Sequence, residues 1–211
     1  MEKYKTSKRE IVLHNMINKE FIDLSHINMD FNTYTFEYYL TNYSVNDIVK
    51  KYQKIFNYRK LYNVTSEGCL YCKHGGLHSI TYLGLSNYLD TGIIYINPSS
   101  SNDKDINNIC QHLLSTLEEC FKIHKKVIFI FNLKYLKDYV KNLKISKNIY
   151  EILNNCFYNE ISEMLVINPP KLLSLFTKLF CKAFNNKISV IDQIELYKYC
   201  SQSQINYIVN I

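Results

Sequence analysis

The first third of the chain carries apolar residues at helical spacing. Ser44 followed three residues later by Asp47 indicates a helix start, with the Ser44 hydroxyl as N-cap and Asp in place of the Glu usual in a capping box. From there apolar residues recur three and four positions apart, at Val45, Ile48, Val49, Tyr52, Ile55 and Phe56. A second helix is expected near Tyr34 to Leu40. The pattern predicts an all-helical N-terminal module over residues 1–65.

The next stretch, residues 66–104, is the least regular part of the sequence. All five glycines fall in it, and glycines at this density indicate turns and loops. The run Ile93 to Ile96 is typical of a buried strand that ends before Asn97-Pro98. A long amphipathic helix is expected after it, with an apolar stripe formed by Ile106, Ile109, Cys110, Leu113, Leu114, Leu117, Cys120 and Phe121.

Beyond this helix, short apolar runs alternate with helical patterns. The strands are expected at Val127 to Leu133, Met164 to Ile167 and Ile188 to Ile191. The helices are expected at Tyr135 to Leu143, Asn148 to Phe157, Lys171 to Phe184, and from Gln193 to the end. Strands separated by helices favour crossover connections. We therefore predict an α/β domain over residues 66–211, with a mostly parallel sheet covered by helices.

Composition and charge narrow the classes of protein. A hydrophobic content of 47% is enough for a sizeable core, and 5 Gly with 3 Pro argue against collagen-like, linker-rich or turn-rich all-β chains. The net charge of +6 suits phospholipid head groups or nucleic acid, yet no dense Lys/Arg stripe typical of a nucleic-acid binder is present. The polar N-terminus, the lack of a run of roughly 18 apolar residues, and the odd number of irregularly spaced cysteines favour a soluble protein in the reducing cytoplasm. We expect it to be a monomer.

Three segments carry a resemblance to a known family. The segment from Tyr38 through Ser44 to Tyr58-Arg59-Lys60 resembles the helical N-terminal module of the CRAL-TRIO family of lipid-binding and phosphatidylinositol-transfer proteins. The segment Phe157 to Pro170 resembles the strand and Asn-Pro turn that precede that family's gate helix, and Val127 to Lys134 resembles its central strand. Together these matches cover about residues 34–211.

The resemblance implies a lipid carrier rather than an enzyme, with no cofactor besides a bound lipid. Such a protein holds one hydrophobic ligand on a sheet floor and closes over it with an amphipathic helix, here Lys171 to Phe184, that dips into an anionic membrane surface on docking. The lipid-binding residues would be Phe129, Phe131, Leu165, Ile167, Leu172, Leu175, Phe176, Leu179 and Phe180. The residues at the head group or membrane surface would be Lys171, Lys178, Lys182 and Lys187.

Other interpretations of the same residues remain open. Without the resemblance, Lys171 to Phe184 would be an ordinary crossover helix whose apolar face packs on a sheet. In the family's Tyr-Pro-Glu sequence the carboxylate is used near the head group, whereas this chain has Asn159 at that position. A CRAL-TRIO-like fold that has lost its ligand and serves as a protein-interaction or scaffold module is therefore the alternative function.

One short segment contains candidate zinc ligands. Its four candidates are Cys69, Cys72, His74 and His78. Cysteine and histidine pairs of this kind bind zinc tetrahedrally, but this segment lacks the roughly 12 residues that usually separate the two pairs. A Gly-rich surface loop with reduced thiols is therefore the expected interpretation, and a zinc-dependent nucleic-acid binder is a third candidate function. The sequence shows no local cysteine–histidine pairing that would support nucleophilic catalysis.

Overall fold

The fold was analysed in a computed structural model of the 211-residue chain. The structure describes residues 2–18, 34–65, 68–101, 103, 105–136, 139–170 and 187–210. Three helices come first: α1 (Glu2–Asn18), α2 (Tyr34–Asn42) and α3 (Val45–Leu61). A short helix, α4 (Leu70–Lys73), leads from them into the sheet. None of the described helices is long and apolar enough to cross a membrane.

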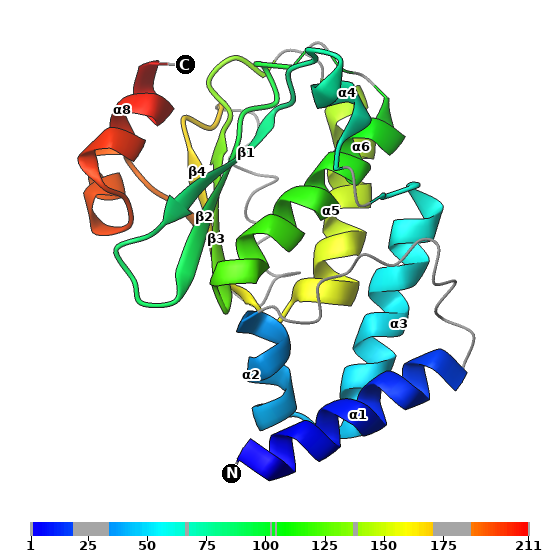
Figure 1. The fold of residues 1–211 in the computed structure, drawn as a ribbon. Helices are drawn as coiled ribbons and strands as arrows, with labels where there is room; N and C mark the ends of the chain where they lie inside the picture. The colour runs from blue at the N-terminus through cyan, green and yellow to red at the C-terminus, as the bar shows by residue number, and fades with distance from the viewer. Residues whose placement is uncertain are drawn as a thin grey trace.

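The sheet has five strands in the order β1-β2-β3-β4-β5 (Figure 1). The strands are β1 (Ile80–Leu85), β2 (Thr91–Ile96), β3 (Lys126–Asn132), β4 (Ile161–Ile167) and β5 (Ile188–Val190). Strand β1 pairs antiparallel with β2, and the remaining neighbours pair in parallel. The predicted α/β class with a mostly parallel sheet is confirmed.

The two faces of the sheet belong to two separate hydrophobic clusters. One face packs against α5 (Ile106–Ile123), α6 (Tyr139–Ile152) and the π-helix η2 (Leu153–Phe157), in a cluster that also contains residues of α2 and α3. The other face packs against the 3-10 helix η3 (Gln193–Lys198) and α8 (Gln202–Asn210). Figure 1 shows α8 on one side of the strands, and α5 and α6 on the opposite side. We call these the α5/α6 face and the α8 face.

The helical N-terminal region agrees with its sequence pattern. Helix α3 begins after Ser44, whose side-chain oxygen accepts a hydrogen bond from the Asp47 backbone N–H at 3.2 Å. Five of the six apolar positions of the predicted stripe are buried, namely Ile48, Val49, Tyr52, Ile55 and Phe56, and Val45 at the start of the helix is partly buried. Residues of α2 and α3 pack in the same hydrophobic cluster as α5, so this cluster does not divide the chain at residues 65 and 66. The domain boundary expected there stays a prediction.

Two elements differ from the sequence-based expectation. Strand β1 was missed because it lies in the Gly-containing stretch, is mostly half-exposed, and is interrupted by an irregularity at Gly84, whose φ is +91°. The two helices expected between β3 and β4 are replaced, in the described residues, by α6 running directly into η2. Helix α5 and strands β2 to β5 lie where they were expected, within a few residues.

Candidate functional site

The register of the parallel strands arranges the α5/α6 face in two apolar rows. Partner residues in adjacent strands point to the same side of a sheet, so each row can be followed from β2 to β5. The first row is Ile94, Phe129, Met164 and Ile188; the second is Ile96, Phe131, Val166 and Val190. We call the second set the outer row, because it lies one pleat nearer the carboxyl ends of the strands.

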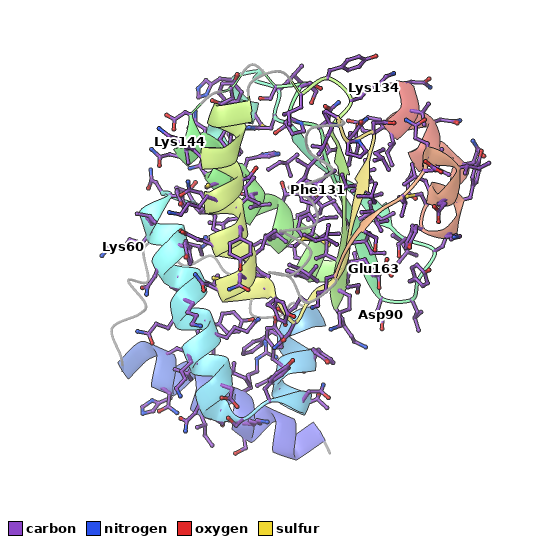
Figure 2. All side chains as sticks on the ribbon, turned by 180° about the vertical axis from the view of Figure 1, so that it is seen from behind. Lys60, Asp90, Phe131, Lys134, Lys144 and Glu163 are labelled. Atoms are coloured by element: carbon purple, nitrogen blue, oxygen red, sulfur yellow. The ribbon has the colours of Figure 1, made fainter. Side chains whose placement is uncertain are left out.

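The outer row is at least partly exposed at two of its four positions. Ile96 and Val166 are buried, Phe131 is half-buried, and Val190 on the edge strand β5 is 50% exposed. Figure 2 shows Phe131 on the side of the strands that faces the helical layer. The half-buried ring on β3 and the exposed valine on β5, with the buried Val166 of β4 between them, form an apolar surface where an apolar ligand or a covering helix can pack.

The sequence-based floor of the lipid pocket needs correction. Phe129 and Phe131 lie on the α5/α6 face, whereas Leu165 and Ile167 belong to the cluster on the α8 face. The four residues therefore cannot line one wall. The error was to pair odd-numbered residues on both strands, although Phe129 is in register with Met164 and Phe131 with Val166. Met164 and Val166 take the places of Leu165 and Ile167.

The predicted gate lies outside the described residues. This applies to the lipid-binding candidates Leu172, Leu175, Phe176, Leu179 and Phe180, and equally to the surface lysines Lys171, Lys178 and Lys182. Their roles stay predictions. The strands that precede and follow this segment, β4 and β5, are parallel neighbours.

Lys187 is the predicted head-group lysine that the structure describes. Its ammonium group donates hydrogen bonds to the backbone carbonyls of Tyr158, at 2.6 Å, and Ile161, at 2.8 Å. It also lies 4.0 Å from the centre of the Tyr158 ring, while burial and the neighbouring Lys126 lower its pKa. Two of its three N–H donors thus bind the protein itself, which gives Lys187 a structural role beside any contact with a ligand.

Glu160, the carboxylate that follows Asn159 in the sequence, also makes contacts within the protein. The Glu160 side chain is 2% exposed, and its Oε2 lies 2.7 Å from the ammonium of Lys51 on α3. Lys51 also donates to the Cys156 carbonyl in η2, at 2.6 Å. Glu160 accepts a hydrogen bond from Tyr39, and burial together with this carboxylate raises the pKa of Tyr39. Glu160 therefore joins the helical region to the start of β4 rather than taking the place of a head-group carboxylate.

The structure brings three of the four candidate zinc ligands together, and His112 takes the place of the fourth, His74. The ligand atoms of Cys69, Cys72, His78 and His112 all lie within 4.8 Å of one another, and we call these four residues the Cys/His cluster. His74, the candidate chosen from sequence spacing, is exposed and lies outside it. His112 was missed because it comes from α5, 34 positions after His78, and reaches the cluster only because α5 packs against β1.

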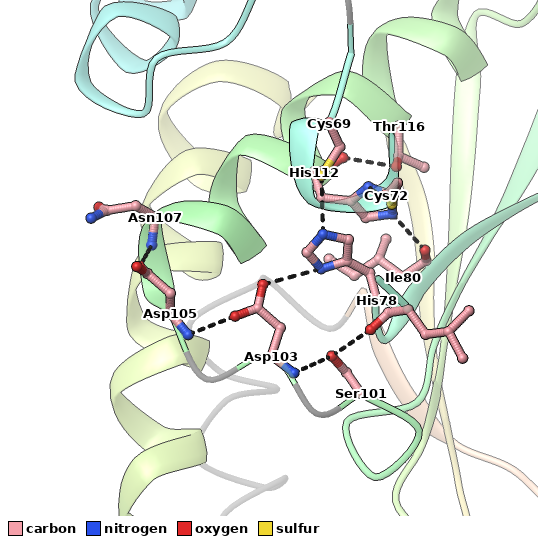
Figure 3. A network of polar contacts seen from close by, with 11 residues as sticks. Cys69, Cys72, His78, Ile80, Ser101, Asp103, Asp105, Asn107, His112 and Thr116 are labelled. Carbon is pink, nitrogen blue, oxygen red and sulfur yellow. Dashed lines mark hydrogen bonds and ion pairs between the residues drawn. The ribbon is translucent and has the colours of Figure 1, made fainter. Parts of the chain in front are cut away.

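Neighbouring groups orient both imidazoles of the Cys/His cluster (Figure 3). His78 Nδ1 lies 3.7 Å from the Asp103 carboxylate, and its Nε2 lies 3.0 Å from the Cys69 sulfur. His112 Nε2 lies 2.8 Å from the Ile80 carbonyl oxygen, and its Nδ1 lies 3.6 Å from the Cys72 sulfur. The Ile80 carbonyl oxygen accepts a hydrogen bond, so the His112 ring has its N–H at Nε2 and a lone pair toward Cys72. On His78, Nδ1 faces the Asp103 carboxylate beyond hydrogen-bond distance, and Nε2 faces Cys69.

The protein environment shifts the pKa of Cys72 and that of His78 toward the neutral forms. Burial and the proximity of Cys69 raise the pKa of Cys72 to about 12. Burial and the proximity of His112 lower the pKa of His78 to about 4. The two rings stack with their centres 4.1 Å apart, an arrangement suited to neutral imidazoles.

Comparison with known proteins identifies the family. The CRAL/TRIO domain profile matches residues 80–207, from the first residue of β1 into α8 and over more than half of the chain. The chain belongs to the CRAL/TRIO domain family. The family resemblance is thereby confirmed, and two of the three segments that carry it, Val127 to Lys134 and Phe157 to Pro170, lie within the match. No curated protein matches the sequence.

A CRAL/TRIO domain is a lipid-binding domain, and proteins of the family generally bind or transfer lipids rather than catalyse reactions. Among solved structures, the crystal structure of Sfh5 matches with 14% sequence identity and a TM-score of 0.49. That match covers 69% of this chain and 60% of the Sfh5 chain, so the chain spans less than two thirds of that structure.

Proposed function

We propose that this protein holds one hydrophobic lipid, a phospholipid or a similar molecule, in an apolar pocket and transfers it between membranes. The observation that carries the proposal is the CRAL/TRIO match over residues 80–207, which includes all five strands and the helices on both faces of the sheet. The protein acts as a carrier and not as an enzyme, and it needs no cofactor besides its lipid.

In this proposal the lipid lies over the outer row of the sheet. Phe131, Val166 and Val190 form an apolar strip on the α5/α6 face, half-buried at Phe131, buried at Val166 and 50% exposed at Val190. Crossovers between parallel neighbours are almost always right-handed, so a connection from β4 to β5 is expected on the same face as α5 and α6. The predicted gate helix would then cover the outer row, with the lipid between them.

The basic residues of the predicted gate provide the membrane contact in this proposal. Lys171, Lys178 and Lys182 fall on the side of the helix opposite its leucines and phenylalanines. Each would contribute on the order of 1 kcal/mol near an anionic surface. The protein would work as a cytoplasmic monomer that docks transiently, opens the gate, and exchanges its lipid.

Two neighbouring residues of β5 give a matched test of this location. Val190→Trp adds bulk to the outer row, whereas Ser189→Trp adds the same side chain to the other face; both positions are exposed. Overfilling a binding site costs about 1–3 kcal/mol, so Val190→Trp should slow transfer of fluorescent phospholipid between vesicles by roughly tenfold. Ser189→Trp should transfer at the wild-type rate. Equal rates for the two variants would contradict a lipid site on this face.

A ligand-free interaction module is the second candidate function. The observation in its favour is that Glu160, the carboxylate closest to the Asn159 position, is buried and paired with Lys51. Without a carboxylate for the head group, a CRAL/TRIO fold could act through its surface alone. This alternative predicts that the wild-type protein transfers none of a panel of phospholipid, sterol and retinoid probes above the spontaneous rate.

A further inference from the structure

The Cys/His cluster has the composition and the spacing of a metal site. Zinc prefers cysteine sulfur and histidine nitrogen in tetrahedral sites, with bonds of about 2.3 Å and 2.0–2.1 Å. Those lengths place a sulfur and a nitrogen ligand about 3.6 Å apart across a tetrahedral ion. The measured pairs are 3.0 Å for Cys69 with His78 and 3.6 Å for Cys72 with His112, and all four atoms lie within 4.8 Å.

The surroundings of the cluster provide a second and independent observation. The imidazoles that bind zinc usually donate their other N–H to a carboxylate or a backbone carbonyl, which fixes the ring. His78 has Asp103 in this position and His112 has the Ile80 carbonyl. The His78 side chain is 1% exposed, and its Nδ1 and the facing Asp103 Oδ2 are buried without a close hydrogen-bond partner. A metal on Nε2 would hold the proton on Nδ1 and strengthen that contact.

Asp103 is itself fixed for this role. Its Oδ1 accepts a hydrogen bond from the Asp105 backbone N–H at 2.9 Å, and Asp105 is the N-cap of α5. The backbone N–H of Asp103 donates to Ser101 Oγ at 3.0 Å, and that hydroxyl donates to the Leu77 carbonyl. The loop before α5 is thus bonded to the segment that carries His78. These contacts hold the carboxylate beside the ring.

We propose that the Cys/His cluster binds one zinc ion. Four protein ligands complete a tetrahedral shell and leave no position for water or substrate, so the site is structural rather than catalytic. The ligands come from α4 and the residue before it, from the approach to β1, and from α5. The ion therefore fixes the irregular segment between α3 and the edge strand β1 onto α5.

Metal content of the purified full-length chain tests the proposal. In reducing buffer without chelator, elemental analysis should find about one zinc per chain, as expected for a Cys2His2 site. After chelation, titration with cobalt should give the visible bands of tetrahedral Co²⁺ and a thiolate charge-transfer band. A wild-type protein with no zinc, no tetrahedral cobalt spectrum, or a Cys69–Cys72 disulfide under these conditions would overturn the proposal.

Three variants assign the ligands. His112→Ala should lose the zinc, whereas His74→Ala, a histidine in the same segment but outside the cluster, should keep it. Asp103→Asn should keep the tetrahedral cobalt spectrum but bind zinc about 10–100-fold more weakly, as expected for a group that orients a ligand. Loss of zinc from His74→Ala together with retention in His112→Ala would refute the assignment. If His112→Ala is insoluble, the wild-type cobalt spectrum decides the question.

Discussion

Replacing Lys51 by Met should lower the free energy of unfolding by about 3–5 kcal/mol, the usual cost of leaving one partner of a buried ion pair alone. The Lys51 side chain is 19% exposed and faces Glu160, which is almost fully buried. Removal of the ammonium leaves the Glu160 carboxylate unpaired and also frees the Cys156 carbonyl of η2. Urea unfolding followed by circular dichroism measures the loss.

Two controls separate charge from packing in this prediction. Lys198→Met breaks an exposed pair between Lys198 and Glu195, whose side chains are 63% and 39% exposed. Solvent screens such a pair, so this variant should unfold at nearly the same urea concentration as the wild type. The double variant Lys51→Met/Glu160→Gln removes both charges and should recover much of the stability lost in the single variant. Equal losses for Lys51→Met and Lys198→Met would contradict the role assigned to the buried pair.

Phe176→Asp should abolish lipid transfer while the protein stays folded. Phe176 belongs to the apolar side of the predicted gate and lies outside the described residues, so the expectation rests on the sequence pattern. An unpaired carboxylate costs several kcal/mol in an apolar environment, which corresponds to a loss of transfer of more than about tenfold. Transfer of fluorescent phospholipid between vesicles measures it, with circular dichroism to confirm folding.

The control for this variant carries the same new charge at an exposed apolar position. Leu89 is 89% exposed in the turn between β1 and β2, so Leu89→Asp should transfer lipid at the wild-type rate. Wild-type transfer by a folded Phe176→Asp protein would instead assign the segment Lys171 to Phe184 to ordinary crossover packing.

The sequence predicts which segments form the sheet better than it predicts which face each residue occupies. The apolar run of β3 is buried on both sides of the sheet, so every residue from Val127 to Ile130 looks alike in the pattern. The face depends on register, and register depends on pairing with β4, which the sequence of one strand does not contain. That is why Phe129 and Leu165, which were expected to line one wall, lie on opposite faces of the sheet.

The same limit explains the difference at the Cys/His cluster. Local spacing can find ligands that are neighbours in sequence, such as Cys69 and Cys72, but it favours His74 because that histidine is close by. His112 looks like an ordinary polar position of α5, and only the packing of that helix against β1 brings it to the cysteines. Sites assembled from distant segments therefore require the fold before their residues can be chosen.

The lipid content of the purified protein tests the central claim most directly. Native mass spectrometry of the full-length chain, followed by organic extraction and identification of the bound molecules, should reveal about one lipid per chain, as expected for a single apolar pocket. Val190→Trp should carry much less of the same lipid, and Ser189→Trp as much as the wild type. A wild-type protein that is reproducibly free of lipid, and that takes up none from vesicles, would contradict the proposed function and favour an interaction module.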